Sequence, residues 1–139
     1  MLTTRLLHPE ILRALAEAGH GAQVLIADGN YPLLTRSSPA ARRVYLNLAP
    51  GMLTVTDVLG VLTEAIVVEE AHVMLPESGE EPAIFAEFRA GLPGIELQPL
   101  GRYAFYDAAR GPDVALAIST GEQRIYANLL LTIGVVPPT

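Results

Sequence analysis

Residues 19–32 read Gly-His-Gly-Ala-Gln-Val-Leu-Ile-Ala-Asp-Gly-Asn-Tyr-Pro. The centre of this stretch, Gln23–Ala27, is a short apolar run between turn signals, which favours a buried strand over a second helix. His20 precedes this strand, Asp28 follows it, and Pro32 stops any continuation. Ligands in open α/β sheets tend to bind beyond the carboxyl ends of strands, where this prediction puts Asp28. The stretch therefore supplies a carboxylate and a histidine, the side chain that changes charge near neutral pH.

A predicted helix precedes this stretch. From Pro9 to Ala18 the apolar residues recur at helical spacing, and Pro9 suits the first position of a helix. Gly19 can adopt the left-handed conformation that ends helices, so His20 is expected just past the helix C-terminus. Two interpretations stay open: the Gly-His-Gly and Asp-Gly segments belong to a catalytic site, or they are an ordinary helix cap and an ordinary turn.

The rest of the chain alternates between strand and helix patterns. Arg43–Leu48 alternates as a strand does, and Thr54 or Thr56 can cap a helix that runs to about Ala65. Gly60, inside that helix, suggests close packing there, since glycine otherwise costs about 1 kcal/mol relative to alanine. We expect further strands within 66–75 and at 95–97, 114–119 and 125–133, and further helices at 81–90 and 102–110. This alternation favours the α/β class.

The length of 139 residues favours one globular domain spanning residues 1–139. Half of the residues are apolar and only 17% are charged, which hints at surface that is buried between subunits. The net charge of −6 argues against nucleic acid as a partner, because phosphate binding draws on clustered lysine and arginine.

Several other classes of protein are disfavoured. The chain has no cysteine, and hence no disulfide, thiol nucleophile or cysteine-ligated metal. Its N-terminus lacks the apolar core of a signal peptide, and no apolar run reaches the roughly 18 to 20 residues that span a membrane. There is no Gly-x-Gly-x-x-Gly, P-loop or metal-spaced histidine cluster. We therefore expect a soluble, cytoplasmic protein that needs no metal and no cofactor.

Polar residues gather in the C-terminal part of the chain, where a purely structural strand would not need them. They are Arg102, Tyr103, Tyr106, Thr120, Glu122, Tyr126 and Asn128. Tyr126 and Asn128 are two apart, so on a strand both would point the same way. Such a mixture of hydrogen-bond donors and acceptors suits a polyhydroxylated ligand, although for any one residue an ordinary interface or strand-edge role remains the alternative.

Four motifs, in order along almost the whole chain, carry a resemblance to a known family. They are residues 19–21, Ala27-Asp28-Gly29-Asn30-Tyr31-Pro32, Arg102-Tyr103-Ala104-Phe105-Tyr106, and Thr120-Gly121-Glu122 with Tyr126-Ala127-Asn128. On these motifs the chain resembles the RbsD/FucU family of monosaccharide mutarotases, which includes ribose pyranase and L-fucose mutarotase.

The resemblance implies a cofactor-free interconversion of sugar ring forms. It also implies an α/β fold with a three-layer, α/β/α-like sheet, which assembles into ring-shaped homo-oligomers that are often decamers. The histidine matching His20 is the proton donor in that family, and the other matching positions bind the sugar. Those positions are Asp28, Arg102, Tyr126, Ala127 and Asn128, with Tyr106 as a weaker candidate.

The choice of sugar stays open at this point. Arg102 matches the fucose branch, whereas Tyr126-Ala127-Asn128 is closer to the ribose branch, and Asn30 departs from some fucose-type members. We therefore expect a mutarotase of L-fucose or a related aldose, with D-ribose pyranase as the alternative.

Two further interpretations come from other classes of protein. One is a non-catalytic sugar-binding or assembly protein. A hydrolase using Ser37 or Ser119 with His20 is disfavoured, because no nucleophile-elbow sequence is present. We expect His8 and His72 to be solvated or hydrogen-bonded groups without a part in the chemistry.

Overall fold

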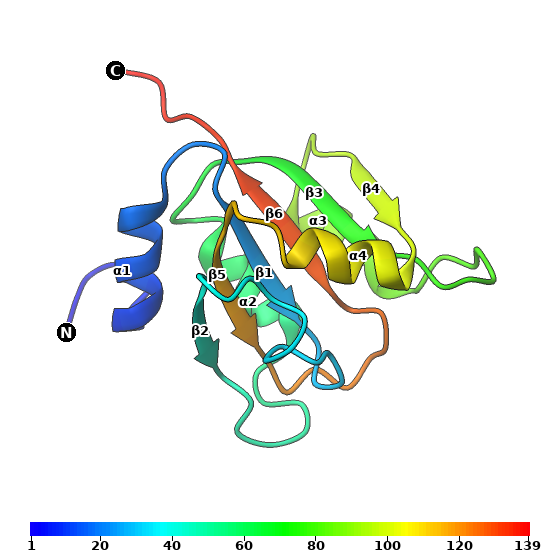
Figure 1. The fold of residues 1–139 in the computed structure, drawn as a ribbon. Coiled ribbons are helices and arrows are strands. Elements are labelled where there is room, and N and C mark those ends of the chain that lie inside the picture. Colours follow the sequence, from blue (N-terminus) through cyan, green and yellow to red (C-terminus); the bar gives the residue numbers. More distant parts are fainter.

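The computed structural model describes residues 1–139 (Figure 1). Its helices are α1 (Pro9–Ala18), α2 (Val55–Leu62), α3 (Ile84–Gly91) and α4 (Arg102–Ala109). Its strands are β1 (Gln23–Ala27), β2 (Arg42–Tyr45), β3 (Val68–Met74), β4 (Leu97–Leu100), β5 (Val114–Ser119) and β6 (Leu129–Ile133). None of the helices is long and apolar enough to cross a bilayer.

The strands form one mixed sheet in the order β2-β5-β1-β6-β3-β4. Strands β2, β5 and β1 pair in parallel, as do β3 and β4, whereas β6 runs antiparallel to its neighbours β1 and β3. The central strands are apolar because both of their faces are covered: every residue of β6 is buried, as is all of β1 after Gln23.

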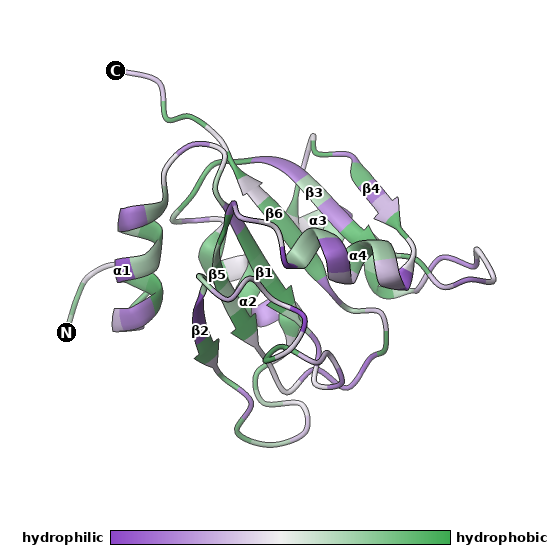
Figure 2. Cartoon of the chain, viewed as in Figure 1, coloured by the Kyte–Doolittle hydropathy of each residue, from purple (hydrophilic) through white to green (hydrophobic).

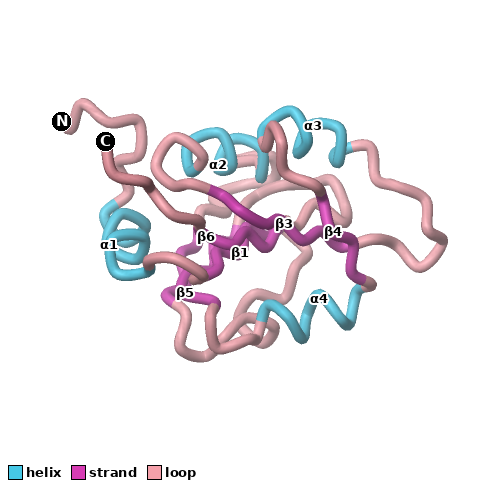
Figure 3. Tube along the Cα trace, turned by 90° about the horizontal axis from the view of Figure 1, so that it is seen from above, coloured by secondary structure: helices cyan, strands magenta, loops and turns pink.

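Helices cover both faces of this sheet, as the view along it shows (Figure 3). The larger core, of 23 buried residues, joins the sheet to α2, α3 and the inner side of α1. The smaller core, of 12 buried residues, lies under α4 on the opposite face and includes Phe105 and Tyr106. Hydropathic colouring shows that β1, β5 and β6 are mostly apolar, whereas α1 and α4 carry hydrophilic bands (Figure 2). The expected three-layer α/β arrangement is confirmed.

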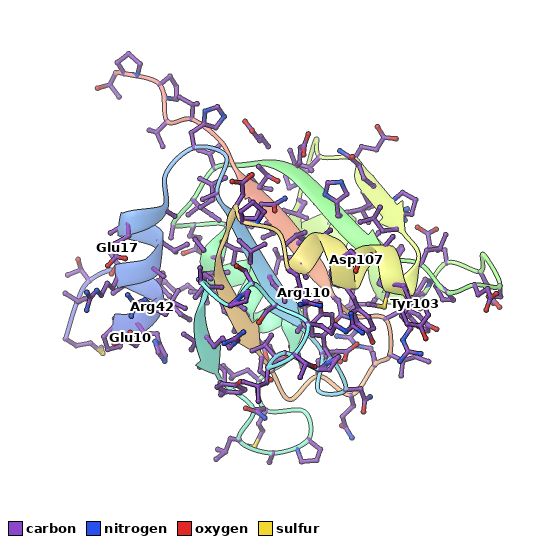
Figure 4. All side chains as sticks on the ribbon, viewed as in Figure 1. Glu10, Glu17, Arg42, Tyr103, Asp107 and Arg110 are labelled. Carbon is purple, nitrogen blue, oxygen red and sulfur yellow. The ribbon has the colours of Figure 1, made fainter.

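Local sequence explains where the helices begin. Nδ1 of His8 accepts a hydrogen bond from the Ile11 N–H at the start of α1. Thr54 and Asp57 form a reciprocal capping box at the start of α2. Helix α1 is tied to the edge of the sheet by Arg42, which lies between Glu10 and Glu17 (Figure 4) and forms ion pairs with both.

Gly60 does not mark close packing, contrary to the expectation from its place in α2. A Cβ atom built on Gly60 would meet no heavy atom within 4 Å. The close approach occurs instead at Gly121, where a Cβ atom would overlap the carbonyl groups of Ala49 and Met52.

Three predicted strands differ from the observed ones. The strand expected at Arg43–Leu48 is β2, which begins at Arg42 and ends at Tyr45. The strand expected at 95–97 is β4, at Leu97–Leu100, and it continues through Pro99 because β4 is an edge strand, where a missing N–H is tolerated. The strand expected at 125–133 begins only at Leu129. Tyr126 has a φ of 59°, which is incompatible with a strand, and the Ala127 N–H bonds to a side chain rather than to a neighbouring strand.

Candidate functional site

Asp28 and Asn128 form the centre of a polar site at the end of β1. The Asp28 N–H donates to Oδ1 of Asn128 at 2.8 Å, and Nδ2 of Asn128 donates back to Oδ2 of Asp28 at 3.2 Å. The same Oδ2 accepts from the Ala127 N–H at 3.2 Å, and Oδ1 accepts from the Asn30 N–H at 3.0 Å. The two loops that follow β1 and precede β6 are therefore joined at this point.

The Asp28 carboxyl group is almost fully enclosed, with 3% of the residue exposed. Burial raises the pKa of Asp28 above its ordinary value, and the hydrogen bonds from Asn30, Ala127, Tyr31 and Asn128 oppose that rise without cancelling it. A carboxyl group held in this way has fixed oxygen positions for the hydroxyl groups of a ligand.

A cavity of about 310 Å³ opens beside this carboxyl group. It is lined by Asp28, Asn30, Tyr31, Met74, Arg102, Tyr106, Ile125, Tyr126 and Asn128. These residues come from the loops after β1 and before β6, the end of β3 and the first turns of α4. The volume is at the lower end of the range for small-molecule sites.

Aromatic and cationic groups form the α4 side of the cavity. Nε of Arg102 donates to the hydroxyl of Tyr106 at 3.1 Å, and its guanidinium lies over the rings of Tyr103 and Tyr106. The Tyr106 ring in turn meets Tyr31 edge to face at 5.3 Å. The hydroxyl of Tyr31 donates to the Arg36 carbonyl, and burial raises the pKa of Tyr31, so this phenol stays protonated. The two terminal nitrogens of Arg102 make no hydrogen bond within the chain, so they can donate to a ligand.

The structure brings together most, but not all, of the residues predicted for the site. Asp28, Arg102, Tyr106, Tyr126 and Asn128 line the same cavity. Ala127 does not line it: its side chain belongs to the larger core, and its contribution is the N–H bound to Asp28. Alternation predicted that Tyr126 and Asn128 would share one face of a strand. They lie outside a strand instead, because the backbone at Tyr126 is left-handed, but both side chains still line the cavity.

His20 lies at the other end of β1. It lines a separate cavity of about 670 Å³, together with residues of α1 and of the loop before β5, none of which borders the Asp28 cavity. The five residues of β1 separate His20 from Asp28 by about 16 Å of extended chain. The His20 side chain is 56% exposed, and its Nε2 lies 3.0 Å from Oε2 of Glu69. Within one chain, His20 and Asp28 cannot contact the same small molecule.

The Thr120-Gly121-Glu122 motif binds the backbone on either side of Asp28. Oγ1 of Thr120 donates to the Ala27 carbonyl at 2.7 Å, and the Gly29 N–H donates to the Glu122 carbonyl at 2.9 Å. The buried Glu122 carboxylate accepts from the Val55 N–H, the first residue of α2, and from Arg124. Burial opposes ionisation of Glu122, but the hydrogen bonds from Arg124 and Val55 outweigh it and lower the pKa of Glu122.

Sequence reasoning missed several residues of this region. Tyr31 lies just past the end of β1, in the same motif as Asp28, and Met74 is the last residue of β3. Both could have been found from their place at the carboxyl end of a strand, where ligands tend to bind. Glu69 carried no local signal. His8 is a helix cap, as expected for a structural histidine. For His72, the expected solvation or hydrogen bonding was wrong at Nδ1, which is buried without a hydrogen-bond partner, and its absence from the chemistry stays a prediction.

The fold and this site define a small α/β protein with a polar ligand cavity built around a buried carboxyl group. The sequence profile of the RbsD / FucU transport protein family matches residues 1–136, and the chain belongs to this family.

Relatives with assigned names are similar over nearly the whole chain. A D-ribose pyranase of Paracidovorax citrulli is 32% identical, over 97% of this chain and 98% of that protein. A fucose mutarotase of Bos taurus is 34% identical, over 96% of this chain and 92% of that protein.

Solved structures share the fold. Bacillus subtilis RbsD complexed with D-ribose superimposes with a TM-score of 0.84 at 24% identity, covering 99% of this chain and all of that one. The fucose mutarotase of Streptococcus pneumoniae in complex with L-fucose gives a TM-score of 0.78 at 26% identity, covering 94% of each chain.

Proposed function

We propose that this protein is a monosaccharide mutarotase, an isomerase that interconverts ring forms or anomers of an aldose. The observation that carries the proposal is the buried Asp28–Asn128 pair beside a cavity that also presents Arg102, Tyr106 and Tyr126. Carboxylate, amide, guanidinium and phenol groups together offer both acceptors and donors, as the hydroxyl groups of a sugar require.

The reaction needs only proton transfers. A proton is delivered to the ring oxygen while the bond from that oxygen to the anomeric carbon breaks, and the anomeric hydroxyl loses its proton as a carbonyl forms. Reclosure on either face of the carbonyl reverses both transfers. We assign proton delivery to His20 and sugar binding to Asp28, Arg102, Tyr126 and Asn128, with a weaker role for Tyr106. A positioned acid or base contributes typically about 10²- to 10⁴-fold.

The geometry supports a site made by two copies of the chain. His20 and the Asp28 cavity lie at opposite ends of β1, and His20 is half-exposed. We therefore infer that His20 of a second copy reaches the Asp28 cavity in a symmetric ring, in which each interface repeats the same contact. Exposed apolar side chains near the cavity mouth, Tyr103 and Ile125, suit burial at such an interface.

For the substrate, we favour L-fucose or a related aldose, with D-ribose as the alternative. Arg102, which matches the fucose branch, lines the cavity beside Tyr106 and Tyr126. We further infer that the protein acts on free sugars of cytoplasmic carbohydrate metabolism.

Saturation-transfer proton NMR tests the proposal, with L-fucose and D-ribose offered in turn. We expect anomeric exchange faster than in buffer, and His20→Ala to abolish that acceleration. The matched control is His8→Asn, because asparagine preserves the helix cap that His8 provides. Equal exchange with the intact protein and with His20→Ala would contradict the proposal.

The second candidate is a sugar-binding protein without turnover. The separation of His20 from the cavity within one chain is the observation that favours it. The same NMR samples decide between the two functions: chemical-shift changes on sugar titration without any acceleration of exchange would support binding alone.

A further inference from the structure

Two arginines without a carboxylate partner meet at the aromatic wall of the Asp28 cavity. All nine basic residues of the chain are arginines, and five of them form salt bridges: Arg5, Arg13, Arg42, Arg89 and Arg124. Arg36 and Arg102 form none, although their guanidinium carbons lie 5.4 Å and 5.5 Å from the centre of the same Tyr106 ring. The two positive charges are therefore no farther apart than these two distances added together.

The loop that carries Arg36 is held in place by hydrogen bonds. Arg43 donates from Nε to the Ser37 hydroxyl at 2.9 Å and from Nη2 to the carbonyls of Ser37 and Ser38. The Arg36 carbonyl accepts from the Tyr31 hydroxyl at 2.7 Å. The Arg36 residue is half-buried, and its guanidinium makes no hydrogen bond within the chain. Its charge is therefore fixed near the cavity but is not used by the fold.

No carboxylate of the site neutralises these two charges. Asp28 bonds to its neighbours in the two loops and forms no salt bridge, and burial raises its pKa, which favours the neutral form. Glu77 lies nearby but binds neither arginine. The Debye length is about 8 Å at physiological ionic strength, so the two guanidinium groups repel each other across the ring. An anion bound beside them would be attracted by both.

Space for an anionic group adjoins the Asp28 cavity. A second cavity of about 450 Å³ lies beside the first turn of α4, and Arg102 and Tyr126 line both cavities. A sugar in the Asp28 cavity can thus extend a substituent past Arg102. Nε of Arg102 is occupied by the Tyr106 hydroxyl, which leaves the two terminal nitrogens free. Together they form the fork that binds the two oxygens of one carboxylate.

We propose that the preferred substrate is an aldouronate, an aldose with a carboxylate on its terminal carbon, and that this carboxylate binds Arg102 in the field of Arg36. This inference rests on the proposed function, because it names the substrate class of the same site. The ring oxygen and the anomeric hydroxyl are the same groups in an aldouronate and in its neutral parent, so the ring-opening chemistry is unchanged. Because the chain carries a net charge of −6, an anionic substrate needs a local positive field to approach.

The first test compares sugars that differ in one charged group. L-Galacturonate and L-fucose differ only by a carboxylate in place of a methyl group, and D-galacturonate with D-galactose is a second pair. In saturation-transfer NMR we expect kcat/KM of anomeric exchange to be roughly 10- to 100-fold higher for at least one uronate than for its neutral partner. Added salt should reduce this advantage without affecting the neutral sugar. Equal values for both members of both pairs would overturn the proposal.

Substitutions of single arginines separate contact from charge. Arg102→Gln should remove the preference for the uronate, and Arg102→Lys should restore only part of it, because lysine keeps the charge but not the fork. Arg36 lines neither cavity, so Arg36→Gln should weaken the uronate alone, by about 2- to 3-fold at low salt.

Arg110→Gln is the matched control for Arg36→Gln. Arg110 also lacks a carboxylate partner, but it borders neither cavity and lies at the opposite end of α4 from Tyr103 (Figure 4). We expect Arg110→Gln to match the intact protein with both sugars. Equal losses in Arg36→Gln and Arg110→Gln, or an Arg36→Gln loss that is the same for the uronate and its neutral partner, would contradict the role of Arg36.

A binding measurement separates this inference from the proposed function. Calorimetric titration of His20→Ala, in which turnover is removed, should show tighter binding of the uronate than of its neutral partner, and Arg102→Gln added to this variant should abolish the difference. That result without anomeric exchange in the intact protein would contradict the proposed function alone. Exchange of neutral sugars with no preference for a uronate would overturn this inference alone, and binding of neither sugar would overturn both.

Discussion

Asp28 and Asn128 exchange two hydrogen bonds across 100 residues of sequence: the Asp28 N–H binds Oδ1 of Asn128, and Nδ2 of Asn128 binds Oδ2 of Asp28. Both residues are buried, with 3% and 2% exposed. The pair therefore both closes the fold at the end of β1 and sets the polar wall of the cavity.

Removing the side-chain amide of Asn128 should lower the stability of the fold as well as disrupt the site. Asn128→Ala leaves the buried Asp28 N–H without an acceptor, and we expect a loss of roughly 1–3 kcal/mol in the free energy of unfolding. Urea denaturation measures this loss. Asn30→Ala is the control, because only the backbone of Asn30 bonds to Asp28, and its effect should stay within about 0.5 kcal/mol. Equal losses in the two variants would contradict the importance of the Asn128 side chain.

Glu122 should make the protein sensitive to acid. Its pKa is lowered in the folded state by Arg124 and the Val55 N–H, despite its burial. The stability that it contributes is therefore complete above its unfolded pKa of about 4.3 and is lost as the pH falls through the lower, folded value. Unfolding free energies measured from neutral to acidic pH should fall less steeply in Glu122→Gln than in the intact protein. Glu96→Gln, at an exposed position, should follow the intact protein, and parallel curves for all three would contradict this account.

Two glycines should respond to alanine in opposite directions. Gly60→Ala should raise the free energy of unfolding by about 1 kcal/mol, because Gly60 lies inside α2 and its Cβ would meet nothing. Gly121→Ala should lower it by roughly 1–3 kcal/mol, because its Cβ would overlap the carbonyls of Ala49 and Met52. Thermal unfolding of both variants checks the pair. Destabilisation by Gly60→Ala would show that α2 packs more closely there than the geometry indicates.

Local pattern accounts for much of the fold. The strand at 114–119 was predicted at its observed bounds, and so was β1, because each is an apolar run between strong turn signals. The placement of His20 before β1 and of Asp28 after it follows from the same pattern. That placement already implied that the two residues lie at opposite ends of a strand.

The parts that could not be predicted depend on contacts between distant segments. Nothing near Tyr126 in sequence indicates that Asp28 takes the Ala127 N–H and so prevents β6 from beginning earlier. Glu69 likewise meets His20 only because β6 lies between β1 and β3 in the sheet. The strand expected at 95–97 lies at Leu97–Leu100 instead, and only the position of β4 at the sheet edge explains why it includes Pro99.

The most direct test of the account mixes two inactive variants, His20→Ala and Asp28→Asn, in one assembly. When the two variants are co-expressed in equal amounts, they mix at random in a symmetric ring. About one quarter of the sites then have an intact His20 from one copy and an intact Asp28 from its neighbour. Saturation-transfer NMR should therefore show anomeric exchange recovered to about that fraction of the intact rate, while each variant alone shows none. No recovery, with the intact protein active under the same conditions, would contradict a site shared between copies.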